Sequence, residues 1–165
     1  MVEMDRLCRE LSRMHGKYIA YRIRRVNATW ITDDVLTSAT ARVVRLVALA
    51  LIESPSDDPE VVQVIVGYHA ETMARRLKGK MDRLLGDLSR THGSNIAYRI
   101  RRKNATWIRD NILQAATAEI VRSVALALIE SPSDDPEVVQ ALVDDQAEKM
   151  GTELWRQHRR HVGDQ

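Results

Sequence analysis

The sequence predicts an all-α fold built as a tandem duplication of a three-helix unit. Three observations carry this prediction: a composition rich in helix formers, a repeat with a period of 77 residues, and proline-bounded connections between apolar segments of helical spacing. The 165 residues include no Phe and only seven Gly, which disfavours β-sandwiches and loop-rich folds. We therefore expect a helical bundle without β-sheet.

An internal repeat organises the chain. Aligning each residue with the one 77 positions later pairs Met4–Lys80 with Met81–Gln157, and 50 of the 77 pairs are identical. Residues 47–63 and 124–140 share the sequence VALALIESPSDDPEVVQ without a change. We divide the chain into a first repeat, 1–80, and a second repeat, 81–165. Because each is small for an independent core, we expect one continuous domain with shared apolar surface, or a homodimer.

Capping residues and prolines set the boundaries of three helices in each repeat. Pro55 ends the second helix of the first repeat, and Asp57 or Asp58 can cap the third, which has Pro59 in its first turn. The same residues recur in the second repeat. The expected helices lie near residues 3–27, 31–53, 58–79, 81–104, 108–130 and 135–159.

At two junctions the sequence leaves both a break and a continuous helix as alternatives. Only Gly79 interrupts the pattern between 58–79 and 81–104, and a lone Gly costs about 1 kcal/mol against Ala, so these two helices can fuse. Between 3–27 and 31–53, Asn27 and Thr29 can cap a helix, but no Gly or Pro forces a turn. One unbroken helix over both segments is therefore an alternative.

The connection SPSDDPEVV, the near-exact repetition and the composition resemble those of computationally designed helical repeat proteins, in which an Asp-Asp-Pro-Glu-Val-Val helix start is common. The resemblance implies an engineered scaffold and implies no activity. The segment HGKYIAYRIRRVNATW departs from it, since idealised designs seldom combine His, Gly, Asn and Trp in a helix. A function, or later mutation, is expected to show in this segment.

Charge and cysteine content exclude several classes of function. The formal net charge of +2 gives no global attraction to nucleic acid or membranes. Cys8 is the only cysteine, which excludes a disulfide framework and a multi-thiolate zinc site. The N-terminal segment is charged, and no run approaches the roughly 20 apolar residues of a transmembrane helix. We expect a soluble cytoplasmic protein.

The repeated segment places polar residues on a face that is expected to point inward. At 100° per residue, His15 and Arg22 fall in the middle of the apolar stripe of residues 3–27. Counting outward from the two expected turns puts them level with His69 and Arg76, with a tyrosine beside each histidine. The deduced candidate site comprises six side chains: His15, Tyr18, Arg22, Tyr68, His69 and Arg76.

The second repeat differs at the paired positions, which makes the first repeat the candidate ligand site. Asn95, Asp145, Gln146 and Glu153 stand where the first repeat has Tyr18, Tyr68, His69 and Arg76. We hypothesise a polar cavity for an anionic or metal-bearing small molecule, haem being the specific version, with His15 and His69 as metal ligands. In the alternative, Arg22 pairs with Asp33, Arg76 extends into water and the histidines are hydrogen-bonded core residues.

No constellation of catalytic residues with defined spacing occurs, so we expect binding or a structural role instead of enzymatic activity. Two histidines without a second pair of ligands do not complete a tetrahedral zinc site. The alternative function is binding of nucleic acid through the repeated IAYRIRR segments, because arginines grip phosphates and tyrosines stack on bases. The near-neutral charge and the acidic SDDPE connections argue against it.

Overall fold

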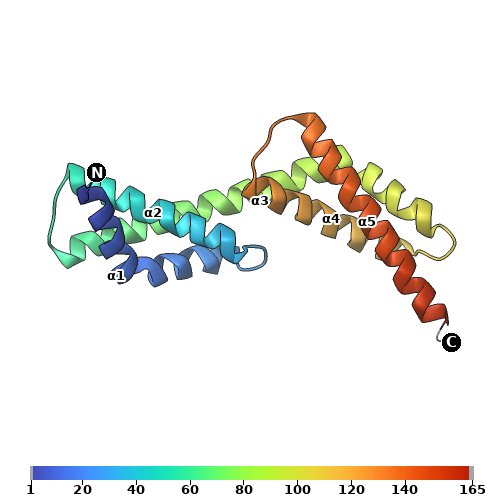
Figure 1. Cartoon of the computed structure of the whole chain (residues 1–165), viewed down its shortest axis with the longest axis horizontal. Helices are drawn as coiled ribbons and strands as arrows, with labels where there is room; N and C mark the ends of the chain where they lie inside the picture. Colours follow the sequence, from blue (N-terminus) through green and yellow to red (C-terminus); the bar gives the residue numbers. More distant parts are fainter. Residues whose placement is uncertain (1, 164–165) are drawn as a thin grey trace. The chain divides into compact units, whose positions relative to one another are not determined.

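The computed structural model describes residues 2–163, and within them the chain forms five helices and no strand. The helices are α1 (Val2–Asn27), α2 (Asp33–Glu53), α3 (Pro59–Asn104), α4 (Asp110–Glu130) and α5 (Pro136–Gly163), as Figure 1 shows. The all-α prediction is confirmed. Helix α5 continues past the expected end at residue 159, and the His158 ring stacks on Trp107 with the ring centroids 4.2 Å apart.

The chain divides into two compact units, a first unit of Met1–Lys80 and a second unit of Met81–Gln165. Helix α3 is one uninterrupted helix of 46 residues, so its first part belongs to the first unit and the remainder to the second. The helices expected at 58–79 and 81–104 are therefore fused. Gly79 is too weak an interruption, and a Cβ atom there would meet no other atom within 4 Å.

The junction between α1 and α2 is a turn, so the alternative of one unbroken helix is wrong. The Asn27 carbonyl oxygen accepts hydrogen bonds from the backbone N–H groups of Trp30 at 3.2 Å and Ile31 at 3.0 Å. Thr32 then caps α2, because its hydroxyl accepts a hydrogen bond from the backbone N–H of Val35 at 3.3 Å. Backbone and cap together end one helix and start the next without Gly or Pro.

Aliphatic side chains from three helical segments fill the core of each unit. Burial of one such side chain contributes roughly 1.5–3 kcal/mol, so these residues are the main source of stability. Buried in the first unit are Ile19, Ile23, Val43, Val47 and Val66, and at the equivalent positions of the second unit Ile96, Ile100, Ile120, Val124 and Val143.

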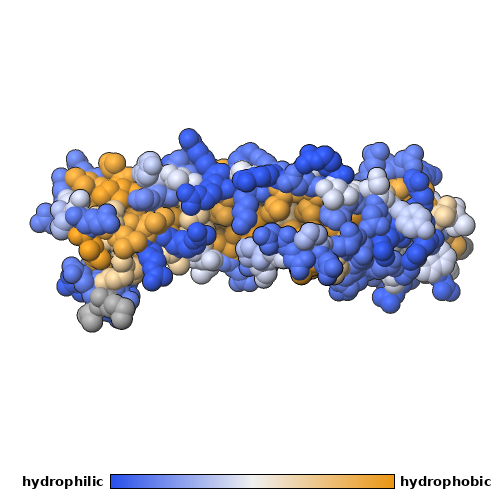
Figure 2. Space-filling model, turned by 90° about the horizontal axis from the view of Figure 1, so that it is seen from above, coloured by the Kyte–Doolittle hydropathy of each residue, from blue (hydrophilic) through white to orange (hydrophobic). Residues whose placement is uncertain are grey.

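Helices α2 and α4 are long and apolar enough to cross a membrane by length and composition alone. Eight residues of α2 and seven of α4 are buried within their units, as in the core helix of a globular bundle. Some apolar side chains nevertheless remain on the surface of the first unit, where Figure 2 shows hydrophobic residues gathered on one face. Those of α2 are Leu46, Leu49 and Ile52.

Candidate functional site

Two hydrogen bonds fix the register between α1 and α3 in the first unit. The Arg22 guanidinium donates to the Glu71 carboxylate at 2.7 Å, 49 positions later in the chain. The Asn27 amide donates to the Ala74 carbonyl oxygen at 3.1 Å, 47 positions later. This nearly constant separation means that the two helices run in the same direction.

The layers deduced from the sequence are wrong by about one and a half helical turns. They paired His15 with His69 and Arg22 with Arg76, which are 54 positions apart. Five residues correspond to about 7.5 Å along a helix. Counting from a turn assumes that both helices begin level with each other, whereas Asn27 sets the register through its bond to α3. His15 and His69 therefore do not face each other in one layer.

Of the six expected site residues, the structure brings together Tyr18 and Arg22. The Arg22 guanidinium lies 2.6 Å from the Tyr18 hydroxyl and 2.7 Å from the Glu71 carboxylate. The hydrogen bond to Glu71, with a second one to Tyr18, raises the pKa of Arg22, and the bond from Arg22 lowers the pKa of Glu71. Arg22 is thus neutralised by Glu71, an acid that was not among the residues expected from the sequence. The expected pair of Arg22 with Asp33 is wrong, since Asp33 contacts Arg24 at 3.3 Å.

The remaining expected residues form no hydrogen bond or ion pair with this cluster in the part of the chain that the structure describes. Tyr68 is 66% exposed, and its ring packs edge-on against the ring of His69 with the centroids 5.3 Å apart. Arg76 is exposed and makes no hydrogen bond or ion pair within residues 2–163. In the same range, no group of three or more His, Cys, Asp or Glu side chains could hold a metal ion. The pocket that His15 lines, within the described part of the chain, contains none of the other five residues.

The second unit builds its polar cluster on the same acid position. Arg99 contacts Glu148 at 3.1 Å and Asp144 at 3.2 Å, and the Asn95 amide donates to Asp144 at 3.1 Å. Burial by itself would raise the pKa of Glu148, but the hydrogen bonds from Arg99 and Lys103 outweigh it and lower that pKa. The sequence contains a signal for the acid that pairs with this arginine, because Glu71 and Glu148 occupy equivalent positions in the two repeats.

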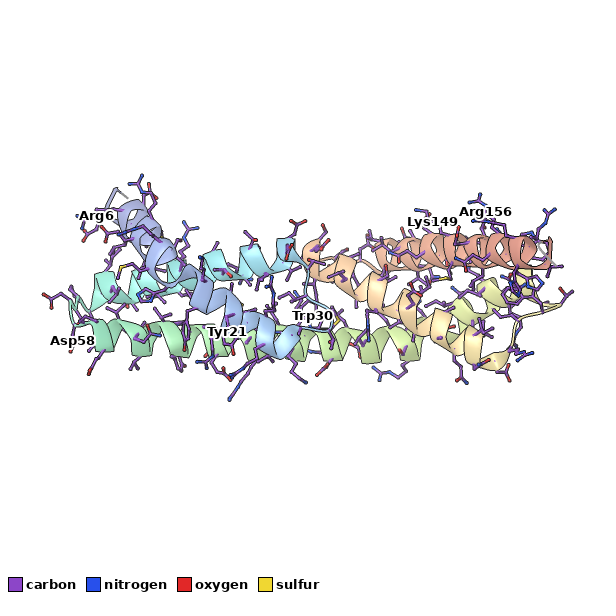
Figure 3. All side chains as sticks on the ribbon, turned by 90° about the horizontal axis from the view of Figure 1, so that it is seen from below. Arg6, Tyr21, Trp30, Asp58, Lys149 and Arg156 are labelled. Atoms are coloured by element: carbon purple, nitrogen blue, oxygen red, sulfur yellow. The ribbon has the colours of Figure 1, made fainter. Side chains whose placement is uncertain are left out.

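A buried asparagine explains the end of the repeated segment. Asn27 is 1% exposed, and its amide donates to the carbonyl oxygens of Ile23 at 3.0 Å and Ala74 at 3.1 Å. Its side-chain oxygen accepts from the indole N–H of Trp30 at 3.1 Å; Trp30 lies in the turn after α1 (Figure 3). The second unit repeats these bonds with Asn104, Ile100, Gly151 and Trp107. The Asn-Ala-Thr-Trp sequence therefore joins the turn to the neighbouring helix.

In the IAYRIRR segments the tyrosines are exposed, whereas most of the arginines that point outward form ion pairs with acidic side chains. Tyr21 and Tyr98 are 58% and 62% exposed. Three arginines contact acids, in the pairs Arg24–Asp33, Arg101–Asp110 and Arg102–Glu148 at 3.3, 3.5 and 3.1 Å. These pairs lower the positive charge available to phosphates, so they disfavour the nucleic-acid alternative.

His15 lines a partly open pocket of about 320 Å³ in the first unit. The pocket lies where α1 meets the end of α2 and the start of α3, and Figure 1 shows α1 changing direction along its length. Its volume is at the lower end of the range for small-molecule sites, roughly 300–1,000 Å³. The apolar lining consists of Leu7, Leu11, Met14, Leu51, Pro59 and Val62, and the polar lining of Glu10, His15, Ser56 and Asp57.

Haem fits this pocket poorly. Its two propionates would approach the carboxylates of Glu10 and Asp57, and among the described residues no Lys or Arg lines the pocket to pair with them. His69, the other histidine expected to hold a metal, is not among the lining residues. The haem version of the hypothesis therefore finds no matching set of groups around His15.

Comparison with protein-family models, with curated proteins and with solved structures finds no match to this chain. No relative therefore supplies a ligand or a reaction for the pocket or for the polar clusters.

Proposed function

We propose that the chain is an engineered, non-catalytic helical repeat scaffold whose first unit binds a small molecule in the pocket at His15. The observation that carries this proposal is the pocket itself, in which aliphatic side chains and a few polar groups converge on one space. Of the six residues expected to form a site, His15 lines this pocket, whereas Tyr18 and Arg22 are engaged in the cluster with Glu71.

The use of polar residues within the fold supports the scaffold role. The Arg22–Glu71 and Arg99–Glu148 pairs recur at equivalent positions, so they serve both units in the same way. The buried amides of Asn27 and Asn104 have hydrogen-bond partners for both oxygen and nitrogen. The two asparagine amides, which are satisfied by their neighbours, stabilise the fold and leave little to offer a reactant.

The origin by design is supported by the connections between helices. The hydrogen bonds that the serine and aspartate side chains of the two connections accept have equivalent donors and the same lengths in both units. Exposed connections usually diverge faster than buried segments after a natural duplication. Two identical connections beside altered helix surfaces fit repetition of one idealised unit followed by changes elsewhere.

Binding in the pocket is tested by blocking it. Met14 lines the pocket and is 68% exposed, so Met14→Trp narrows the entrance without filling the core. Thr91→Trp, at the equivalent position of the second unit, is the matched control. Small apolar compounds are titrated into all three proteins by isothermal calorimetry. We expect binding by the parent and by Thr91→Trp, and loss in Met14→Trp. Equal binding by both variants, or none by the parent, contradicts the proposed function.

A further inference from the structure

The charges around the His15 pocket point to the class of its ligand. Two carboxylates, Glu10 of α1 and Asp57 of the connection before α3, belong to the lining, and no Lys or Arg does within the part of the chain that the structure describes. Neither carboxylate makes a hydrogen bond or an ion pair within residues 2–163. Asp57 is not needed to cap α3, since the backbone N–H of Glu60 donates to the neighbouring Asp58. Two negative charges thus remain available at the pocket.

The rest of the lining favours an apolar body. Leu7, Leu11, Leu51 and Val62 offer hydrocarbon surface from all three helical segments of the first unit. A ligand gains by burying its own apolar surface against them. The imidazole of His15 adds one nitrogen that can accept a hydrogen bond when the ring is neutral. A compound with a hydrocarbon body and one positively charged nitrogen matches both parts of the lining.

We propose that the pocket binds a cationic apolar compound, an organic amine in its ammonium form, with Glu10 and Asp57 as the groups that select its charge. This inference rests on the proposed function and adds the ligand class to it. It replaces the anionic ligand expected from the sequence, because the arginines invoked for that ligand do not line the pocket. Arg22 is bound to Glu71, and Arg76 lies on the exposed surface.

The second unit provides a matched comparison for the two acids. Asp87 and Asp134 occupy the positions equivalent to Glu10 and Asp57. Asp87 is engaged in an ion pair with Arg90, whereas Arg13, the equivalent of Arg90, makes no such pair with Glu10 within the described residues. A free acid at this position therefore distinguishes the first unit from the second.

The test compares three compounds with one hydrocarbon body and different charge: adamantylamine, adamantanol and adamantane carboxylate. Each is titrated into the full chain at pH 7 by isothermal calorimetry. We expect the amine to bind roughly tenfold more tightly than the alcohol, and the carboxylate to bind most weakly, since two partly screened carboxylates supply a modest preference. Raised salt should reduce the advantage of the amine.

Removal of the two carboxylate charges then tests whether Glu10 and Asp57 cause the preference for the amine. In the double variant Glu10→Gln with Asp57→Asn, the amine should lose its roughly tenfold advantage over the alcohol. Both side chains are exposed, so the fold should persist, as circular dichroism checks. The control Asp87→Asn with Asp134→Asn should keep the preference.

The outcomes separate the inference from the proposed function. Equal binding of amine and alcohol, or a preference that survives loss of Glu10 and Asp57, overturns the ligand class and leaves a pocket that binds apolar compounds. Absence of binding by all three compounds, or binding that is unchanged in Met14→Trp, overturns the proposed function itself.

Discussion

The Tyr18 hydroxyl lies 3.8 Å from the point that a Cβ atom on Gly67 would occupy. The second unit replaces both residues together, with Asn95 in place of Tyr18 and Asp144 in place of Gly67, and the shorter pair bonds directly at 3.1 Å. Each pair of residues fills the space between two equivalent helical segments, next to the arginine that both units share at this position. The difference between Tyr18 and Asn95, one of the four that suggested a ligand site, is therefore an exchange of one packing arrangement for another.

This exchange predicts strong coupling between the two positions. Tyr18→Asn alone removes the hydroxyl that lies at Gly67 and accepts a hydrogen bond from Arg22, and Gly67→Asp alone places a carboxylate at the tyrosine hydroxyl. Each single change should lower the free energy of unfolding, and the double variant should recover part of the loss. We expect a coupling of about 0.5–3 kcal/mol, measured by urea denaturation. Additive single effects would contradict it.

The buried asparagines should be costly to replace in both units. Asn27→Ala leaves the indole N–H of Trp30 without its acceptor. It also removes the hydrogen bond that the side-chain amide of Asn27 donates to the carbonyl oxygen of Ala74. We expect a loss of about 1–3 kcal/mol for each buried group left without a partner, read from thermal melting. Asn104→Ala should cost a similar amount. Trp30→Phe, which removes the indole donor, should cost less than Asn27→Ala.

Acid should weaken the Arg22–Glu71 pair. The folded pKa of Glu71 lies below its ordinary value of 4.5, so its contribution to stability is present above that value and lost as the pH falls through the folded pKa. Glu71→Gln should lower the melting temperature at pH 7, and the difference from the parent should shrink below about pH 4.5. Glu53→Gln, at an exposed position, is the control. A difference that stays constant from pH 7 to pH 3 would contradict this origin.

The uninterrupted course of α3 is tested at Gly79. A Cβ atom there meets no neighbour, so Gly79→Ala should raise the free energy of unfolding by up to about 1 kcal/mol. Gly79→Pro should lower it by about 3 kcal/mol, because proline removes a backbone hydrogen bond and clashes with the preceding turn. Chemical denaturation followed by circular dichroism measures both. A proline variant as stable as the parent would show that the helix is broken near this residue.

The helices were predictable from local chemistry, whereas the partner of Arg22 was not. Pro55 and Asp58 mark a helix end and a helix start by their own backbone and side-chain properties. The partner of Arg22 depends on how far α1 is shifted along α3. A shift of five residues along α3 places Glu71, and not Arg76, beside Arg22. The expected anion site is then an internal ion pair. A comparison of the two repeats favours the ion pair. The acid at Glu71 is kept as Glu148 in the second repeat, whereas the position of Arg76 is occupied there by Glu153.

The two connections between helices share one sequence and one geometry. In each, a serine hydroxyl accepts a hydrogen bond from a backbone N–H at 3.2 Å and an aspartate carboxylate accepts another at 3.0 Å. Most of their residues are exposed. Every chain consequently displays the same epitope twice, so a monovalent antibody fragment raised against one connection should bind with two copies per chain. A bivalent antibody against it should cross-link chains into immune precipitates, even when the protein is a monomer.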